Sequence, residues 1–271
     1  MKEVIAGSLG DGRVASTAGG GTALSTTAAF IRLPRITHHI DMFPNTFSTA
    51  VVVKYHINPW LTVLKTTDAM ATAPTDYSNA AQDLSAAAAG VVLSSLGALA
   101  AGDFVLVGAH QPFRGGRAVV NAANGTVSVL TVHYRKSDDT WADSSATDNT
   151  TSGGATFAQT GNVTWTVPTD WKAASLGSIY TSSPMFAFRE TKLYWTRWSV
   201  SVALDASATL DQLLAMNADT ARYLERPSGA VFEEQVQHGQ PGGIGCIEAL
   251  TDAGTAKIIV NAWPTREVGF F

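Results

Sequence analysis

Histidines and an aspartate near the start of the chain are the first residues whose types could bind a metal ion. His38 and His39 are adjacent, Asp41 follows them, and His56 lies further along. Adjacent side chains on a strand point to opposite faces, so His38 and His39 cannot both ligate one ion without help from elsewhere. Structural histidines near an interface are therefore the preferred interpretation, and no metal site is predicted.

A second group of potential ligands is the set of carboxylates Asp138, Asp139, Asp143 and Asp148. Oxygen ligands in a loop suit calcium, but the spacing does not match the D-x-[DN]-x-[DN]-G pattern with its distal glutamate. The same residues with Glu190 could supply two carboxylates for glycoside hydrolysis, yet no spacing singles out a pair. A solvated polar loop is preferred, and calcium binding and glycan cleavage stay open as alternatives.

Cys246 is the one cysteine, which excludes an intrachain disulfide and a multi-cysteine zinc site. Its neighbours Ile244 and Ile247 are typical of a buried strand, where a thiol behaves as a small hydrophobe. P-loop, G-x-S-x-G and H-E-x-x-H motifs do not occur, and the glycine-rich stretch 7–12 lacks the lysine and the preceding strand of a phosphate-binding loop. The residues therefore predict no catalytic centre and no cofactor.

Tryptophans are the remaining candidates, because exposed indole faces could bind sugars whereas buried ones would form a core or an interface. Five of them gather in the second half of the chain: Trp141, Trp165, Trp171, Trp195 and Trp198. Trp195 and Trp198 face opposite sides of one predicted strand, so we expect one in the core and the other on a sheet surface or against a neighbour. Core or interface is preferred, and a carbohydrate-binding module for host recognition stays possible.

The elements that must position these residues are short β-branched and aromatic stretches separated by turn residues. They predict an all-β fold with a β-sandwich or jelly-roll-like architecture. Asn124-Gly125 predicts a tight turn into a strand at 126–134, and Asp252-Ala253-Gly254 predicts a hairpin between 244–250 and 256–262. The clearest strand is 193–204, which alternates along its length.

One short helix is predicted at about residues 209–222, because Leu210, Leu213 and Leu214 fall at helical spacing behind the potential cap Thr209. The first 29 residues are rich in Gly, Ala, Ser and Thr and predict an extended Gly-rich N-terminal arm. A β-sandwich domain then spans 30–271. An alternative divides it into 30–100 plus 229–271 and 101–208.

Charge and hydropathy argue against two function classes, nucleic-acid binding and membrane insertion. The chain has 271 residues, a net charge of −4 and 15% charged residues, against about 25% in a typical domain. This balance argues against a strongly basic nucleic-acid binder. The longest apolar run, 86–101, is broken by Gly and Ser and does not predict a membrane span, and we find no signal peptide. Such a surface suits a protein packed against neighbours, so the expected partner is a second copy, not nucleic acid or a membrane.

A set of motifs between residues 102 and 204 occurs in a recognisable order. They are Gly102-Asp103-Phe104, Pro112-Phe113-Arg114-Gly115, Trp141, Gly161-Asn162-Val163-Thr164-Trp165, Pro168-Thr169-Asp170-Trp171 and Leu193-Tyr194-Trp195-Thr196-Arg197. This order resembles a β-rich segment of structural proteins of tailed bacteriophages. The chain departs from it at Asn149, where Gly is more usual, and at Arg135-Lys136, where a neutral turn is expected.

The resemblance implies a virion component assembled in the host cytoplasm rather than an enzyme. A capsid-exterior accessory (decoration or cement) protein is the leading expectation, with itself and other virion proteins such as the major capsid protein as partners. A tail, baseplate or fibre-attachment protein is the alternative, and a glycan remains a possible ligand. The residues expected at interfaces are Gly19, Gly20, Gly21, Arg114, Arg117, Trp195, Trp198, Phe270 and Phe271.

Overall fold

The computed structural model describes residues 5–6, 15–17, 21–33, 37–48, 52–82, 90–94, 96–218, 224–227 and 244–264. The chain divides into two compact units, Met1–Trp60 with Asp219–Phe271, and Leu61–Ala218. Residues 61–100 therefore belong with the middle of the chain, whereas the alternative subdivision joined them to the N-terminal part. The all-β prediction is confirmed: apart from strands, the described residues form helix α1 (Leu176–Ile179) and two 3₁₀ turns, at Ala80–Gln82 and Leu99–Ala101.

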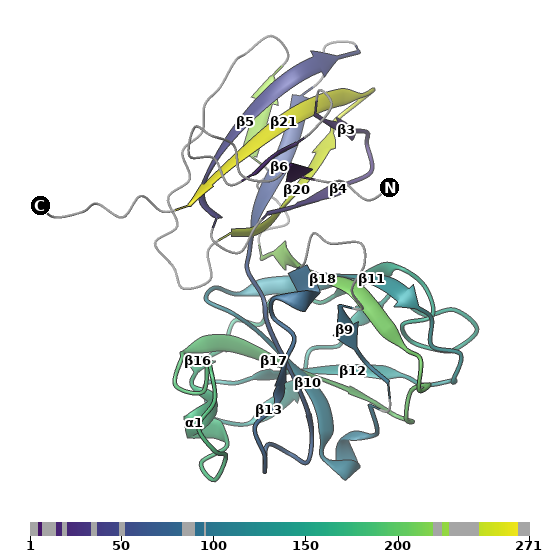
Figure 1. The fold of residues 1–271 in the computed structure, drawn as a ribbon, viewed down its shortest axis with the longest axis vertical. Helices are drawn as coiled ribbons and strands as arrows, with labels where there is room; N and C mark the ends of the chain where they lie inside the picture. The colour runs from purple at the N-terminus through teal and green to yellow at the C-terminus, as the bar shows by residue number, and fades with distance from the viewer. Residues whose placement is uncertain are drawn as a thin grey trace, which may run out of the picture. The chain divides into compact units, whose positions relative to one another are not determined.

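Two antiparallel sheets make up the first unit (Figure 1). In one, β21 (Ala256–Pro264) pairs with β5 (Thr37–Phe47), β3 (Thr22–Leu24) and β2 (Ala15–Thr17), and β2 also pairs with β1 (Ile5–Ala6). The other sheet runs in the order β19 (Leu224–Pro227), β6 (Val52–Pro59), β20 (Ile244–Thr251) and β4 (Ala29–Arg32).

Strands β1, β2 and β3 lie in the segment that was expected to be an arm. Their described residues are hydrogen bonded into the sheet around β21. Gly21, which precedes β3, has a φ of 103°, and a Cβ there would lie 2.3 Å from the carbonyl oxygen of Ile258. Only glycine accepts both the left-handed backbone and this close approach. Gly19 and Gly20 lie outside the described residues.

The second unit also has two antiparallel sheets, each named here by a central strand. The β17 sheet runs β13 (Trp141–Asp143), β12 (Leu130–Arg135), β17 (Leu193–Val200), β10 (Asp103–Ala109), β7 (Thr62–Thr67), β8 (Thr75–Asp76), and β16 (Ala173–Ala174) also pairs with β17. The β11 sheet runs β14 (Thr147–Asp148), β15 (Gly161–Thr164), β11 (Phe113–Ala122), β18 (Thr209–Asn217), β9 (Val91–Val92).

The main core of the second unit lies between its two sheets. Val107 and Trp198 enter it from the β17 sheet, and Phe113 and Leu213 enter it from the β11 sheet. The opposite face of the β17 sheet is covered as well. There Leu64, Phe104, Leu106, Leu193 and Trp195 pack with Met70 and with Leu176 of α1. The central strands of the β17 sheet, β10 and β17, are therefore covered on both faces.

The helix expected at about 209–222 is wrong, because 209–217 is strand β18. This strand is hydrogen bonded to β11 on one edge and to β9 on the other, and every residue from Leu210 to Met216 is buried. A strand whose successive residues are all buried has no solvent-exposed face, so polar and apolar residues need not alternate along it. The leucines at 210, 213 and 214 then reproduce helical spacing by coincidence.

Both expected tight turns connect different sheets. Strands β20 and β21 belong to different sheets of the first unit, and β11 and β12 belong to different sheets of the second. Asn124-Gly125 therefore makes no two-residue hairpin, and Gly125 does not adopt the positive φ that such a turn needs. Instead the buried Asn124 side chain donates to the carbonyls of Thr126 (2.8 Å) and Thr156 (3.0 Å) and accepts from the backbone N–H of Asp205 (3.1 Å).

Replacing Asn124 with alanine tests how strongly this crossing between sheets depends on one amide. Asn124→Ala should lower the free energy of unfolding of the second unit by about 2–4 kcal/mol, because several buried backbone groups lose their partner. Asn121→Ala, which removes one exposed hydrogen bond to Thr209, should cost within about 0.5 kcal/mol. Denaturant titration followed by tryptophan fluorescence measures both, and equal effects would contradict the role given to Asn124.

Candidate functional site

The histidines and the aspartate whose types could bind a metal ion form no metal site among the described residues. His56 is buried on β6 opposite Glu248 of β20. The side chains of His38, His39 and Asp41 lie outside the described residues. Among the side chains that the structure describes, no three histidines, cysteines or carboxylates lie close enough together to hold a metal ion.

Each carboxylate of the acidic stretch is engaged by its own local partners. Asp148 accepts hydrogen bonds from the hydroxyls of Thr150 (2.5 Å) and Thr156 (2.6 Å). Asp138 accepts from the hydroxyl of Thr140 and from the Lys136 ammonium, and these bonds hold its pKa well below the usual range. Asp139 pairs with Lys172 at 3.1 Å, and Asp143 accepts from the Ser145 N–H. The stretch is thus a series of polar turns.

Cys246 lies on β20 and is fully buried. Asn58 donates a hydrogen bond to its Sγ at 3.4 Å, and burial raises the pKa of the thiol to about 12. A thiol with such a pKa is protonated at neutral pH, and the protonated form is a poor nucleophile. The packing role expected from its isoleucine neighbours agrees with this environment.

A thiol reagent offers a direct check of this environment. In the folded protein at pH 8, Ellman's reagent should modify Cys246 at least about a hundredfold more slowly than in the denatured chain, because burial and the raised pKa both suppress attack. Absorbance at the reagent's thiolate band follows the reaction. Equal rates in the folded and denatured protein would show that the thiol is accessible.

The aromatic side chains of the second unit are largely internal. Phe113 contacts both Trp165 and Trp171, and its ring centroid lies 5.5 and 5.2 Å from theirs. Trp165 in turn contacts Trp198 edge-on, with the ring centroids 6.2 Å apart. Trp195 is buried on the other face of the β17 sheet, where its Nε1–H donates to the carbonyl of Ala174 at 2.9 Å. The expectation that Trp195 or Trp198 lies on a surface is therefore wrong, because both faces of their strand are covered.

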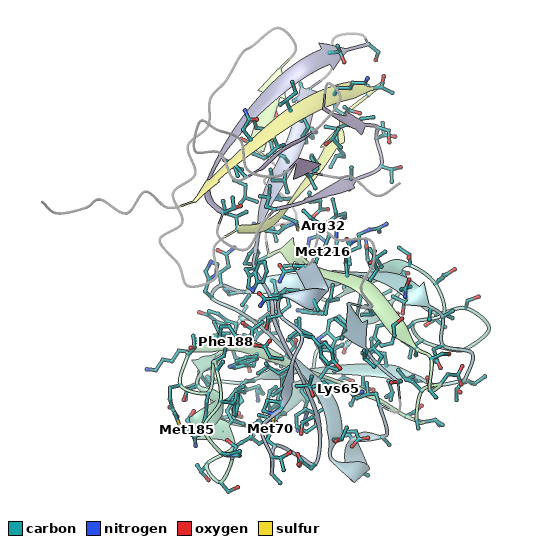
Figure 2. The ribbon with its side chains drawn as sticks, in the orientation of Figure 1. Arg32, Lys65, Met70, Met185, Phe188 and Met216 are labelled. Atoms are coloured by element: carbon teal, nitrogen blue, oxygen red, sulfur yellow. The ribbon has the colours of Figure 1, made fainter. Side chains whose placement is uncertain are left out.

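The other residues expected at interfaces have separate environments. Arg114 and Arg117 are half-buried on β11, where Arg117 donates to the side-chain oxygen of Asn162 at 3.1 Å. Arg114 donates to the sulfur of Met216, which is labelled in Figure 2, at 3.6 Å. Phe270 and Phe271 lie outside the described residues. The structure does not bring these residues into one site, and their interface roles stay predictions.

The β17 sheet does assemble one group of charged and aromatic side chains, named here the cationic cluster: His133, Arg135, Trp141, Tyr180 and Arg197. The strand register places His133 opposite Arg197 and Arg135 opposite Trp141 on one face of the sheet. The guanidinium carbons of Arg197 and Arg135 lie 4.8 and 5.8 Å from the centroid of the Trp141 ring. Such distances give cation–π attraction, which strengthens as the groups lose water.

Further contacts extend the cationic cluster toward the covered part of the sheet. Arg197 also lies over the Phe104 ring at 5.7 Å, and Phe104 stacks on Tyr180 at 5.9 Å. Burial raises the pKa of Tyr180, an effect that the Arg197 cation opposes. Burial lowers the pKa of His133, the Arg197 cation lowers it further, and Asp143 raises it.

No motif in the sequence indicates the cationic cluster. Trp141 and Arg197 stood in the motifs of the resemblance, and Arg135 stood at a departure from them, but they are far apart along the chain. The signal that could have joined them is alternation: Arg197 lies two residues after Trp195 on the same side of the strand. Strand order and register, which sequence alone did not provide, place Arg135 and Trp141 beside it.

The titration of His133 tests the geometry of the cationic cluster. Its pKa in the folded protein should lie below the ordinary 6.5, so the unfolded chain binds the proton more tightly and this group's contribution to stability is lost as pH falls below about 6.5. Imidazole NMR shifts measure the pKa directly. Asp143→Asn should lower it further by removing the opposing carboxylate, and a value at or above 6.5 in the wild type would contradict the environment described.

Comparison with protein-family models, with curated proteins and with solved structures found no match. In the described part of the chain, no helix has the length and apolarity needed to cross a membrane.

Proposed function

We propose that the chain is a structural subunit of a tailed-phage particle and works through contacts between subunits, most simply as a capsid-exterior accessory protein. The observation that carries the proposal concerns the motifs that resemble phage structural proteins. Phe113, Trp165 and Trp171 are mutually in ring contact, and Tyr194 contacts Trp171 at 5.7 Å. The shared residues thus specify the packing of a unit, which supports a shared structural module.

The carbohydrate-binding alternative draws no comparable support. A glycan platform needs exposed aromatic faces, whereas Trp165, Trp171, Trp195 and Trp198 are buried. Trp141 is half-buried and has two guanidinium groups near its ring. The low charged fraction of the chain also favours a surface that is covered by neighbours.

Light scattering on the purified chain, followed by addition to phage particles, tests the proposal. We expect a defined homo-oligomer at micromolar concentration or saturable binding to particles. A monodisperse monomer that binds no particle would overturn it. Deleting residues 1–29 is a poor variant for this purpose, because it removes β1, β2 and β3 from their sheet and so damages the first unit itself.

Exposed valines of the second unit provide a sharper variant. Val127, Val129 and Val202 have 66%, 64% and 49% of their surface exposed, and Val129 exchanges hydrogen bonds with Ser201, next to Val202. If a second copy covers this surface, the double variant Val127→Asp and Val129→Asp should weaken self-association at least about tenfold, since it buries charge in an apolar contact. Sedimentation equilibrium measures the change. Thr147→Asp, an exposed position of the same unit, is the control and should leave association unchanged, and equal effects would remove this surface from the interface.

A further inference from the structure

The cationic cluster holds positive charge that its surroundings only partly neutralise. The Arg197 guanidinium lies near the rings of Trp141 and Phe104 and interacts with the Tyr180 hydroxyl, but it forms no ion pair with a carboxylate of any described residue. Arg135 reaches one carboxylate, Asp139, at 3.4 Å, and that exposed group is shared with Lys172. Half-buried guanidinium groups without matching carboxylates are costly unless something else supplies the negative charge.

Buried polar atoms at the same place lack partners. Arg135 Nε, Arg197 Nε and His133 Nδ1 are each inaccessible to solvent and without a hydrogen-bond partner among the described residues. They come from the neighbouring strands β12 and β17. Buried polar groups are nearly always satisfied, and a group left over indicates a water or a bound ligand. The two arginine Nε–H groups can only donate a hydrogen bond, so the partner that they lack is an acceptor.

The charges around the cluster indicate what kind of acceptor fits. Two guanidinium groups favour an anion with planar, paired oxygens, which an arginine can bind through two parallel hydrogen bonds. Two carboxylates lie at the rim of the cluster: Asp139 pairs with Arg135, and Asp143 lies opposite His133 in the strand register. Two rim carboxylates oppose a doubly charged group such as phosphate more strongly than a singly charged one. A carboxylate therefore matches the cluster best.

We propose that the cationic cluster is a carboxylate-binding site, with Arg197 and Arg135 as the binding groups. The rings of Trp141 and Phe104 lie near the Arg197 guanidinium carbon, and the N–H groups of Arg197 and Arg135 donate to the carboxylate. We assign the carboxylate to an acidic side chain or the C-terminus of a neighbouring protein subunit, and this assignment rests on the proposed function. The assignment of the cluster as a carboxylate-binding site does not depend on that function.

Acetate is the probe that tests the binding chemistry. The Trp141 indole and arginine Nε–H signals of the full chain are followed by NMR during titration with sodium acetate, against sodium chloride at equal ionic strength. We expect saturable shifts with acetate that chloride does not produce. Arg197→Gln should raise the acetate Kd about tenfold or more, as the loss of a charge-assisted hydrogen bond predicts. Arg117→Gln, in the other sheet of the same unit, should not.

Arg197→Lys is the control for the case in which Arg197→Gln simply fails to fold. It keeps the charge but lacks the planar fork, so it should stay folded and still bind acetate more weakly than the wild type. If acetate shifts no signal of the cluster in the wild type, or if both Arg197 variants bind as the wild type does, the proposal is overturned and the cluster is a hydrated structural element.

Self-association and particle binding of the same variants identify the source of the carboxylate. If Arg197→Gln and Arg197→Lys weaken assembly and also weaken acetate binding, the carboxylate belongs to a neighbouring subunit. If they weaken acetate binding while assembly is unchanged, the site stands and serves a free small carboxylate. A chain that binds acetate but neither self-associates nor binds particles would reject the proposed function and leave the site intact.

Discussion

Burial of the central strands of the β17 sheet on both faces is the constraint on which the second unit depends. Strand β17 carries Trp198 into the core between the sheets and Trp195 into the cover on the other side. Gly108 of β10 pairs with Trp195 of β17, and a Cβ on Gly108 would lie 2.5 Å from the indole ring. The indole can therefore lie flat against the neighbouring strand only because that position has no side chain.

The segment that covers this face, β16 and α1, is attached to the sheet through polar groups as well as apolar ones. Trp195 donates to the carbonyl of Ala174 on β16, and Trp171 donates to the carbonyl of Trp195 at 3.2 Å. Because both indole N–H groups have acceptors, these large side chains are buried without the free-energy cost of an unpaired donor. Along β17 the same face passes from the fully buried Trp195 to the half-buried Arg197. The cationic cluster thus lies where burial of this face becomes incomplete.

The sequence predicted those elements whose environment leaves a regular mark on it. Strand β17 was recognised because its residues alternate, and β20 and β21 because the turn residues Asp252-Ala253-Gly254 separate two apolar stretches. Strand β18 was misread because all of its residues from 210 to 216, Asp211 and Gln212 included, are buried, so polar and apolar types do not alternate along it. The turns after β11 and β20 were located but given the wrong partners, because turn residues mark where a chain reverses and do not specify the sheet that it joins.

The candidate site was less predictable than the fold, because it depends on pairing between distant strands. A comparison within the second unit shows why the cationic cluster is unusual. Lys65, labelled in Figure 2, is also a partly buried cation, but its ammonium donates to the carbonyls of Val92 (3.1 Å) and Ser94 (2.8 Å), and burial lowers its pKa. The chain has supplied that cation with acceptors of its own. An arginine keeps its charge under all ordinary conditions, and near Arg197 the described residues supply aromatic rings and the Tyr180 hydroxyl but no carboxylate. In a protein with so few charged residues, this difference between two cations of one sheet is best explained if the negative charge comes from another molecule.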